Sequence, residues 1–190
     1  MEEGSEEDVR VLFDTNYFGT LRVIQAALPL LRAQGSGHIL GVSSTVGLLA
    51  FPVIGSYSAT KWAVEAMHES LAQEVKAFGI KVTLIEPGAY ATEFGSPASL
   101  KFAPGMDAYA PLRQQVFERL STAKRGDPQA TADAMLKLVD AEDPPLRFFL
   151  GNQNLPMVRA AYTSRLAEWD AWADVSNAAQ GSPPKDAAAS

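Results

Sequence analysis

YSATK at residues 57–61 decides how the rest of this chain is interpreted, together with ILGVSS at residues 39–44. The upstream run is apolar and ends in hydroxyls, as a buried strand would, and the downstream stretch opens a helix. Residues four apart on a helix share one face and lie about 6 Å apart along the axis. The Tyr57 hydroxyl and the Lys61 ammonium can therefore reach one site, and Ser44 stands thirteen positions before the tyrosine.

This pair of side chains suits proton transfer to or from an alcohol or a carbonyl. A free phenol has a pKa of about 10, so it is a poor base near neutrality. A neighbouring ammonium favours the phenolate, and we therefore expect Lys61 to lower the pKa of Tyr57. The alternative is an exposed pair on a helix surface, because a tyrosine and a lysine at this spacing often occur together by chance.

Two further stretches accompany the pair. IKVTLI at 80–85 is predicted to be a central parallel strand, which ends in EPG at 86–88, and Thr92 follows four positions after the glycine. Asn16 begins the sequence NYFGT on a predicted helix, and it precedes Ser44 by twenty-eight positions.

In combination these stretches resemble the catalytic half of the classical short-chain dehydrogenase/reductase family. That family has an Asn on a long helix, a Ser after its fifth strand, YxxxK on the next helix and a PGxxxT loop after its sixth strand. All four occur here in that order, over about residues 8–150. The resemblance implies an oxidoreductase that moves hydride between NAD or NADP and a secondary alcohol or ketone, which would be its small-molecule substrate.

The resemblance also assigns catalytic roles. Tyr57 would be the general acid in carbonyl reduction and the base in alcohol oxidation, and Lys61 would hold the ribose hydroxyls of the cofactor beside it. Ser44 would donate a hydrogen bond to the substrate oxygen and stabilise its charge as hydride moves. The alternative for Ser44 is a hydroxyl that caps the loop, and Ser43 is its rival, although the thirteen-residue spacing favours Ser44.

Further roles are implied for residues outside the Tyr-Lys pair. Asn16 would hold a water through its backbone carbonyl and so link Lys61 to solvent. Its alternative is a polar residue that faces solvent. Pro87, Gly88 and Thr92 would line the nicotinamide, with Thr92 at its carboxamide or at the diphosphate; their alternative is a simple turn after a strand.

The glycine-rich turn with which this family cradles the cofactor pyrophosphate has no counterpart here, since no GxxxGxG occurs in the sequence. We therefore expect a truncated family member that lacks the N-terminal cofactor-binding half and binds NAD(P) very weakly or not at all. Two other functions stay open: a non-catalytic remnant that serves as an assembly or binding module, and an isomerase or dehydratase that uses a similar Tyr and Lys.

Composition excludes several other classes of protein. The net charge of −6 is local, because five acids lie in the first eight residues and the other 17 acids face 16 bases. A basic stripe for nucleic acid is therefore absent. There are no cysteines, and neither histidine has metal-ligand spacing around it, so we expect no metal site. The start lacks a signal-like apolar core and no stretch suits a membrane span, so we expect a cytoplasmic protein.

Alternating strands and helices indicate an α/β fold with a partial, Rossmann-like, doubly wound parallel sheet. The expected strands, at about 38–44, 80–85 and 147–150, are flanked by helices. Residues 1–174 would form a single truncated domain, followed by a disordered tail at 175–190 that is rich in Ala, Ser and Pro. The family resemblance implies a homo-oligomer through two long helices, predicted at 6–33 and 56–78.

Overall fold

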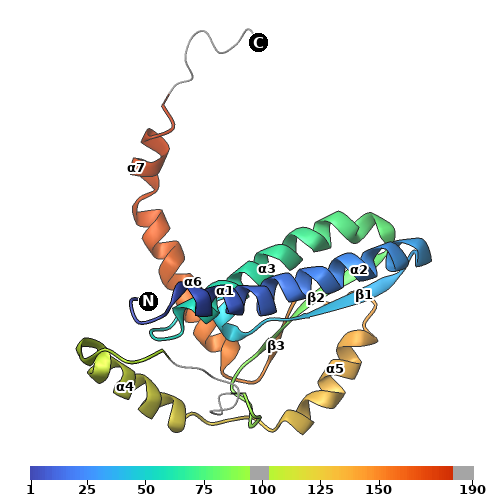
Figure 1. Cartoon of the computed structure of the whole chain (residues 1–190). Coiled ribbons are helices and arrows are strands. Elements are labelled where there is room, and N and C mark those ends of the chain that lie inside the picture. Colours follow the sequence, from blue (N-terminus) through green and yellow to red (C-terminus); the bar gives the residue numbers. More distant parts are fainter. Residues whose placement is uncertain (95–102, 182–190) are drawn as a thin grey trace. The chain divides into compact units, whose positions relative to one another are not determined.

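Three parallel strands form the sheet, in the order β1 (Gly37–Val42), β2 (Ile80–Pro87) and β3 (Arg147–Leu150) (Figure 1). The computed structural model describes residues 1–94 and 103–181. β2 is the central strand, with Gly37 of β1 opposite Ile80 and Arg147 of β3 opposite Leu84. The predicted parallel α/β sheet is confirmed, although β1 ends at Val42 and both serines lie beyond it.

The helical elements alternate with these strands along the chain. In chain order they are α1 (Glu6–Phe13), the π-helical turn η1 (Asp14–Phe18), α2 (Gly19–Gln34), the 3-10 turn η2 (Thr45–Gly47), α3 (Gly55–Val75), η3 (Lys76–Phe78), η4 (Asp107–Tyr109), α4 (Ala110–Ser121), η5 (Pro128–Thr131), α5 (Ala132–Val139), α6 (Asn154–Ala171) and α7 (Ala173–Ala178).

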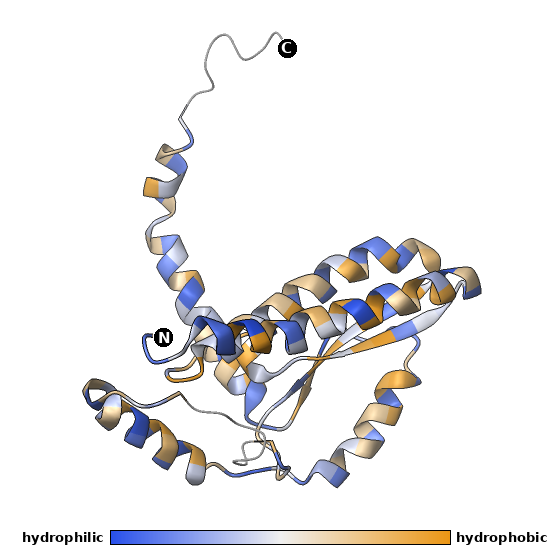
Figure 2. Ribbon diagram, in the orientation of Figure 1, coloured by the Kyte–Doolittle hydropathy of each residue, from blue (hydrophilic) through white to orange (hydrophobic). Residues whose placement is uncertain are grey.

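Helices cover both faces of the sheet, with an apolar cluster under each. On one face, Ile24 of α2 and Leu71 of α3 pack with Val82 of β2. On the other, Leu138 of α5 packs with Ile85 of the same strand. Successive strand residues point to opposite faces, so a central strand covered on both sides needs apolar side chains on both, as β2 has in Val82 and Ile85. Figure 2 shows the hydropathy of these elements in the same view.

The helix predicted at 6–33 is interrupted by η1, around Asn16, and α2 then continues through Pro29 to Gln34. Pro29 therefore does not end the helix. The end lies at Gly35, where φ is 70°, a left-handed conformation that glycine adopts without a steric penalty. The helical segment of α3 and η3 ends in the same way at Gly79, with φ of 71°.

The chain divides into two compact units, Met1–Asn154 and Leu155–Ser190. The second unit is helical over most of its described length and includes α7, which continues to Ala178, past the point at which disorder was expected to begin. The rest of that predicted tail lies outside the described residues from 182 onward. Within the described ranges, no helix has both the length and the apolar character that crossing a lipid bilayer requires.

Candidate active site

The site is built where β1 ends and α3 begins. Ser43 continues the sheet pairing, since its N–H donates to Ile85 O at 2.8 Å, and its side chain is buried. Ser44 is only half-buried, and its hydroxyl accepts a hydrogen bond from the Val46 N–H at 3.4 Å at the start of η2. Of the two serines, Ser44 is therefore the one with access to the site, and it also caps the following turn.

Tyr57 and Lys61 lie one turn apart on α3, as their spacing predicts. The Lys61 ammonium donates to Val42 O at 3.1 Å and lies 5.9 Å from the centre of the Tyr57 ring. The Tyr57 side chain is half-buried and its phenol interacts with the Ser44 hydroxyl. The ring of Phe94 packs beside that of Tyr57, with centroids 5.7 Å apart. The structure thus brings Ser44, Tyr57 and Lys61 together.

Protonation differs from the sequence-based expectation. Burial raises the pKa of Tyr57 above its usual 10, and the hydrogen bond with Ser44 opposes this rise only in part. Burial also lowers the pKa of Lys61, and the negative charge of Glu65 opposes that effect. The expected net lowering of the Tyr57 pKa is therefore not found in this structure, because burial outweighs the polar neighbours of the phenol. Tyr57 is protonated near neutrality.

Asn16 points toward α3 rather than into solvent. Its amide Nδ2 donates to Thr60 Oγ1 at 2.9 Å, and the Thr60 hydroxyl donates to Tyr57 O at 2.8 Å. The carbonyl of Asn16 accepts a hydrogen bond from the Thr20 hydroxyl at 2.8 Å. The solvent-facing alternative is excluded, because Asn16 connects η1 to the turn of α3 that carries Tyr57.

The carboxyl end of β2 supplies the other predicted residues. Pro87 ends the strand, and Thr45 Oγ1 donates to its carbonyl at 3.1 Å. Gly88 packs so closely on Asn154 that a Cβ added to it would lie 2.4 Å from the Asn154 Oδ1. Thr92 is exposed, and its hydroxyl accepts from the Phe94 N–H at 3.3 Å. Thr92 therefore belongs to the loop beside the site, and among the described residues its hydrogen bonds join it to Tyr90 and Phe94.

The loop between Ser44 and Tyr57 holds one strained residue. Val53 has φ of 73°, a left-handed conformation that is rare for a β-branched residue. Such strain persists only where the surrounding structure imposes it, and it is often found close to functional sites.

The sequence analysis did not identify the polar residues that pack next to the site. Glu65 of α3, Glu86 of β2 and Arg147 of β3 form a largely buried charged cluster. Asn154 links the ends of β2 and β3 by donating to Glu86 O and to Leu150 O. A charged residue inside the apolar run of β2 was the available signal for Glu86. The spacing of four from Lys61 was the signal for Glu65.

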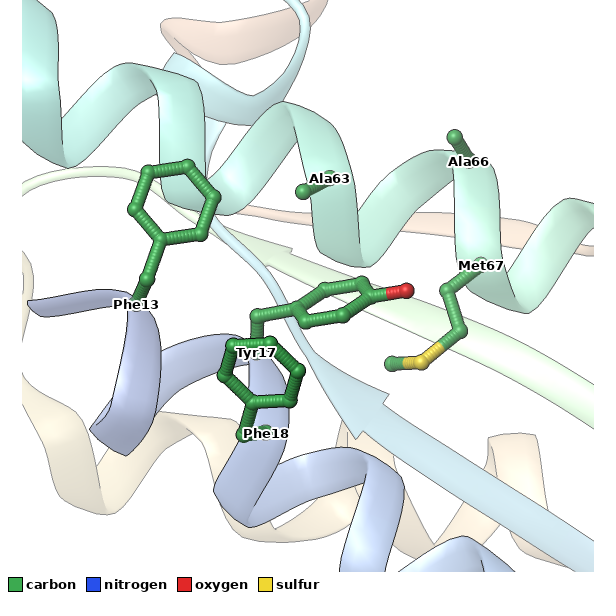
Figure 3. Close-up of a pocket in the computed structure, with 6 residues that line it drawn as sticks. All are labelled: Phe13, Tyr17, Phe18, Ala63, Ala66 and Met67. Carbon is green, nitrogen blue, oxygen red and sulfur yellow. The ribbon is translucent and has the colours of Figure 1, made fainter. Parts of the chain in front are cut away.

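A second, apolar feature lies between η1 and α3. A hollow of about 400 Å³ is lined by side chains of the two helical segments, as Figure 3 shows: Phe13, Tyr17, Phe18, Ala63, Ala66 and Met67. Apart from the Tyr17 hydroxyl, the side chains that line it are apolar. We therefore keep the site at Ser44, Tyr57 and Lys61 separate from this hollow.

The donor set fits the nicotinamide end of NAD(P). A phenol, a hydroxyl and an ammonium gather at the carboxyl ends of parallel strands, which is where open α/β sheets bind ligands. Nothing comparable to a glycine-rich phosphate turn occurs in the sequence. In the described parts of the chain, no group of three His, Asp or Glu side chains could hold a metal ion.

Comparison with known proteins agrees with this arrangement. The family model of short chain dehydrogenases matches residues 1–101, just over half of the chain. An uncharacterised oxidoreductase of Schizosaccharomyces pombe is 37% identical over 158 residues, which cover 80% of this chain and 64% of that protein. A 3-ketodihydrosphingosine reductase of Bacteroides thetaiotaomicron is 33% identical, over 85% of this chain and 60% of that protein.

A solved structure supports the same conclusion. The short-chain dehydrogenase from Streptomyces avermitilis matches with a TM-score of 0.84 and 38% identity, over 94% of this chain and 66% of that one. The chain thus spans about 60% to 66% of the length of these relatives. The family model, the relatives and the solved structure all indicate the same family. The chain therefore belongs to the short-chain dehydrogenase family.

Proposed function

We propose that this chain carries the catalytic residues of an NAD(P)-dependent oxidoreductase that interconverts a secondary alcohol and a ketone. The single observation that carries the proposal is the convergence of Ser44, Tyr57 and Lys61 where β1 and α3 meet. The cofactor, when bound, supplies or accepts the hydride. The family relative named as a ketone reductase, 3-ketodihydrosphingosine reductase, is in keeping with a carbonyl substrate.

The protonation of the site suits the reductive direction. As hydride adds to the carbonyl carbon, the π-electron pair of the C=O bond moves to oxygen, and that oxygen needs a proton. Tyr57 holds its proton near neutrality because burial raises its pKa, so it can donate. The Ser44 hydroxyl stabilises the developing negative charge, and Lys61 stabilises the tyrosinate that remains until it is reprotonated.

Ligand binding and turnover by a matched pair of proteins test this proposal. We expect NADH or NADPH to bind the 190-residue chain weakly, because the sequence contains no glycine-rich turn. A chimera that adds a glycine-rich βαβ unit should bind the cofactor tightly and reduce ketones. In that chimera Tyr57→Phe should abolish turnover and leave cofactor binding intact. Full turnover in the variant would remove Tyr57 from its role.

We also propose that a second copy of this chain covers the long helices. Large apolar side chains are exposed along α1, η1, α2 and α3, among them Val11, Phe18, Val23, Leu30 and Trp62. They accompany the apolar hollow of Figure 3, and a surface of this kind marks an interaction site. This is the face through which the family resemblance implies a homo-oligomer.

The mass of the protein in solution tests the second copy. Val23 is 69% exposed, so Val23→Glu should be tolerated by a monomer and should shift the mass from dimer to monomer in light scattering after size-exclusion chromatography. Val139→Glu is the control of the same residue type, because Val139 is also exposed, at 47%, but lies on α5, over the other face of the sheet. A monomeric wild type, or equal dissociation of both variants, would contradict the proposal.

A further inference from the structure

Two buried glutamates and the half-buried Arg147 meet between α3, β2 and β3. Glu65 of α3 is 4% exposed and Glu86 of β2 is fully buried. The Arg147 guanidinium of β3 reaches both, with Nε 3.0 Å from Glu65 Oε2 and 3.6 Å from Glu86 Oε1. Its other arm extends to the exposed Glu69, at 2.6 Å. One cation therefore serves two buried carboxyl groups.

The carboxylate oxygens of this cluster outnumber the hydrogen-bond donors that reach them. Both oxygens of Glu86 and Oε1 of Glu65 have no hydrogen-bond partner among the residues that the structure describes. An ionised carboxylate in such a place loses its hydration without compensation, and two such anions would also repel each other. Binding one proton removes one charge and the repulsion. The geometry therefore favours one carboxylate, one carboxylic acid and one guanidinium.

Glu86 is the member that holds this proton. Burial and, to a smaller extent, the neighbouring charge of Glu65 raise the pKa of Glu86 to about 8, although Arg147 opposes the rise. Glu65 has the shorter contact with the guanidinium, so it is the better stabilised anion. At neutral pH the cluster therefore consists of neutral Glu86 and a Glu65–Arg147 ion pair.

Glu65 also faces the proposed active site. It follows Lys61 by one turn on the same face of α3, and its charge opposes the lowering of the Lys61 pKa by burial. A Cβ added to Gly47, in the turn after Ser44, would lie 3.0 Å from Glu65 Oε1. The carboxyl group therefore lies between the charged cluster and the segments that carry Ser44 and Lys61.

We propose that Glu65, Glu86 and Arg147 form a one-proton cluster, with the proton on Glu86 at neutral pH, whose remaining negative charge on Glu65 keeps Lys61 cationic. The catalytic role of Lys61 rests on the proposed function. Under that function Glu65 is a positioning residue, which acts on the reaction through the charge of Lys61. The existence of the cluster does not depend on catalysis.

The other charged and titratable groups that face the cluster also lie on the packed elements. His68, on α3, is fully buried against Gly41 of β1, and its Nδ1 lies 2.8 Å from Val64 O. Burial lowers the pKa of His68, so this histidine is neutral and adds no counter-charge. Glu69 contacts the guanidinium from the solvent side.

Titration of the 190-residue chain by NMR, with the glutamate carboxyl carbons and the lysine Nζ labelled, tests the proposal without cofactor or substrate. We expect one glutamate of the folded wild type to titrate near pH 8 and to be absent in Glu86→Gln. In Glu65→Gln the Glu86 titration should move to lower pH, because a repelling charge is lost. Lys61 should also lose its proton at lower pH.

Glu69→Gln is the matched control, since it removes one charge from the same helix and from the same arginine. It should leave a glutamate that titrates near pH 8, with Lys61 as in the wild type. If Glu65→Gln does not fold, Glu65→Asp replaces it and should retain the wild-type Lys61 titration. A wild type in which no glutamate titrates above pH 7 would overturn the cluster.

The link to Lys61 has its own refuting result. A Lys61 titration that is the same in Glu65→Gln as in the wild type, or that moves equally in Glu69→Gln, would overturn the positioning role of Glu65. Failure of the proposed function would look different: the titrations would follow expectation while the chimera with Tyr57 intact showed no turnover.

Discussion

Replacing Glu86 by glutamine should change how the stability of this protein depends on pH. The pKa of Glu86 is raised from 4.5 to about 8 in the folded chain, whereas the unfolded chain has the ordinary value. The folded state therefore binds this proton more tightly than the unfolded state does. The contribution to stability is fully present below pH 4.5, falls as the pH rises, and is lost above pH 8.

The size of this effect follows from the shift itself. At 1.36 kcal/mol per pKa unit, a rise from 4.5 to about 8 corresponds to at most roughly 5 kcal/mol between the two limits. Relaxation around a buried ion lowers such values, so we expect a fall of about 2 to 5 kcal/mol in the free energy of unfolding. Glutamine resembles the protonated acid, so Glu86→Gln should not show this fall.

Urea denaturation followed by circular dichroism at several pH values between 5 and 9 measures the effect. Only the difference between wild type and variant is informative, because His38 and His68 have lowered pKa values and contribute an opposite slope that cancels in the difference. The two proteins should be similar below pH 5, and the variant should be the more stable above pH 8. A difference that does not vary with pH would refute a buried, protonated Glu86.

Three more substitutions test the packing. Gly88→Ala should lose about 1 to 3 kcal/mol in urea denaturation, because its Cβ would lie 2.4 Å from the Asn154 Oδ1. Gly41→Ala should lose a similar amount, since its Cβ would lie 2.2 Å from the buried ring of His68; the double variant with His68→Ala should recover part of the loss, and no recovery would contradict the clash. Asp127→Ala should lose about 1 kcal/mol in thermal unfolding, because its carboxylate accepts from the first turn of η5.

The strands of this fold could be predicted from local sequence. The apolar run of β2 extends from the glycine that ends the preceding helix to Pro87, and such boundaries depend on backbone conformations that single residues set. The spacing of Tyr57 and Lys61 likewise placed both on one face of a helix. Strand ends that depend on pairing with other strands were predicted less accurately. The strand predicted at 38–44 ends at Val42, before the two serines.

The helix around Asn16 shows where local reasoning failed. Proline in a helix interior normally removes a hydrogen bond and clashes with the preceding turn. Nevertheless α2 continues past Pro29 and ends only at Gln34. The π-helical turn η1 has no sequence signal in a single chain, and the amide of Asn16 reaches Thr60, 44 residues later. Tertiary contacts outweigh such local preferences.

The sequence by itself determined the order of the elements, the family and the three polar groups of the site. Only the tertiary structure decided their protonation and their support. Tyr57 keeps its proton because burial outweighs its polar neighbours, and Glu65, Glu86 and Arg147 meet although they lie on α3, β2 and β3. Solvation and charge–charge distances are properties of the packed chain, so spacing along the sequence does not contain them.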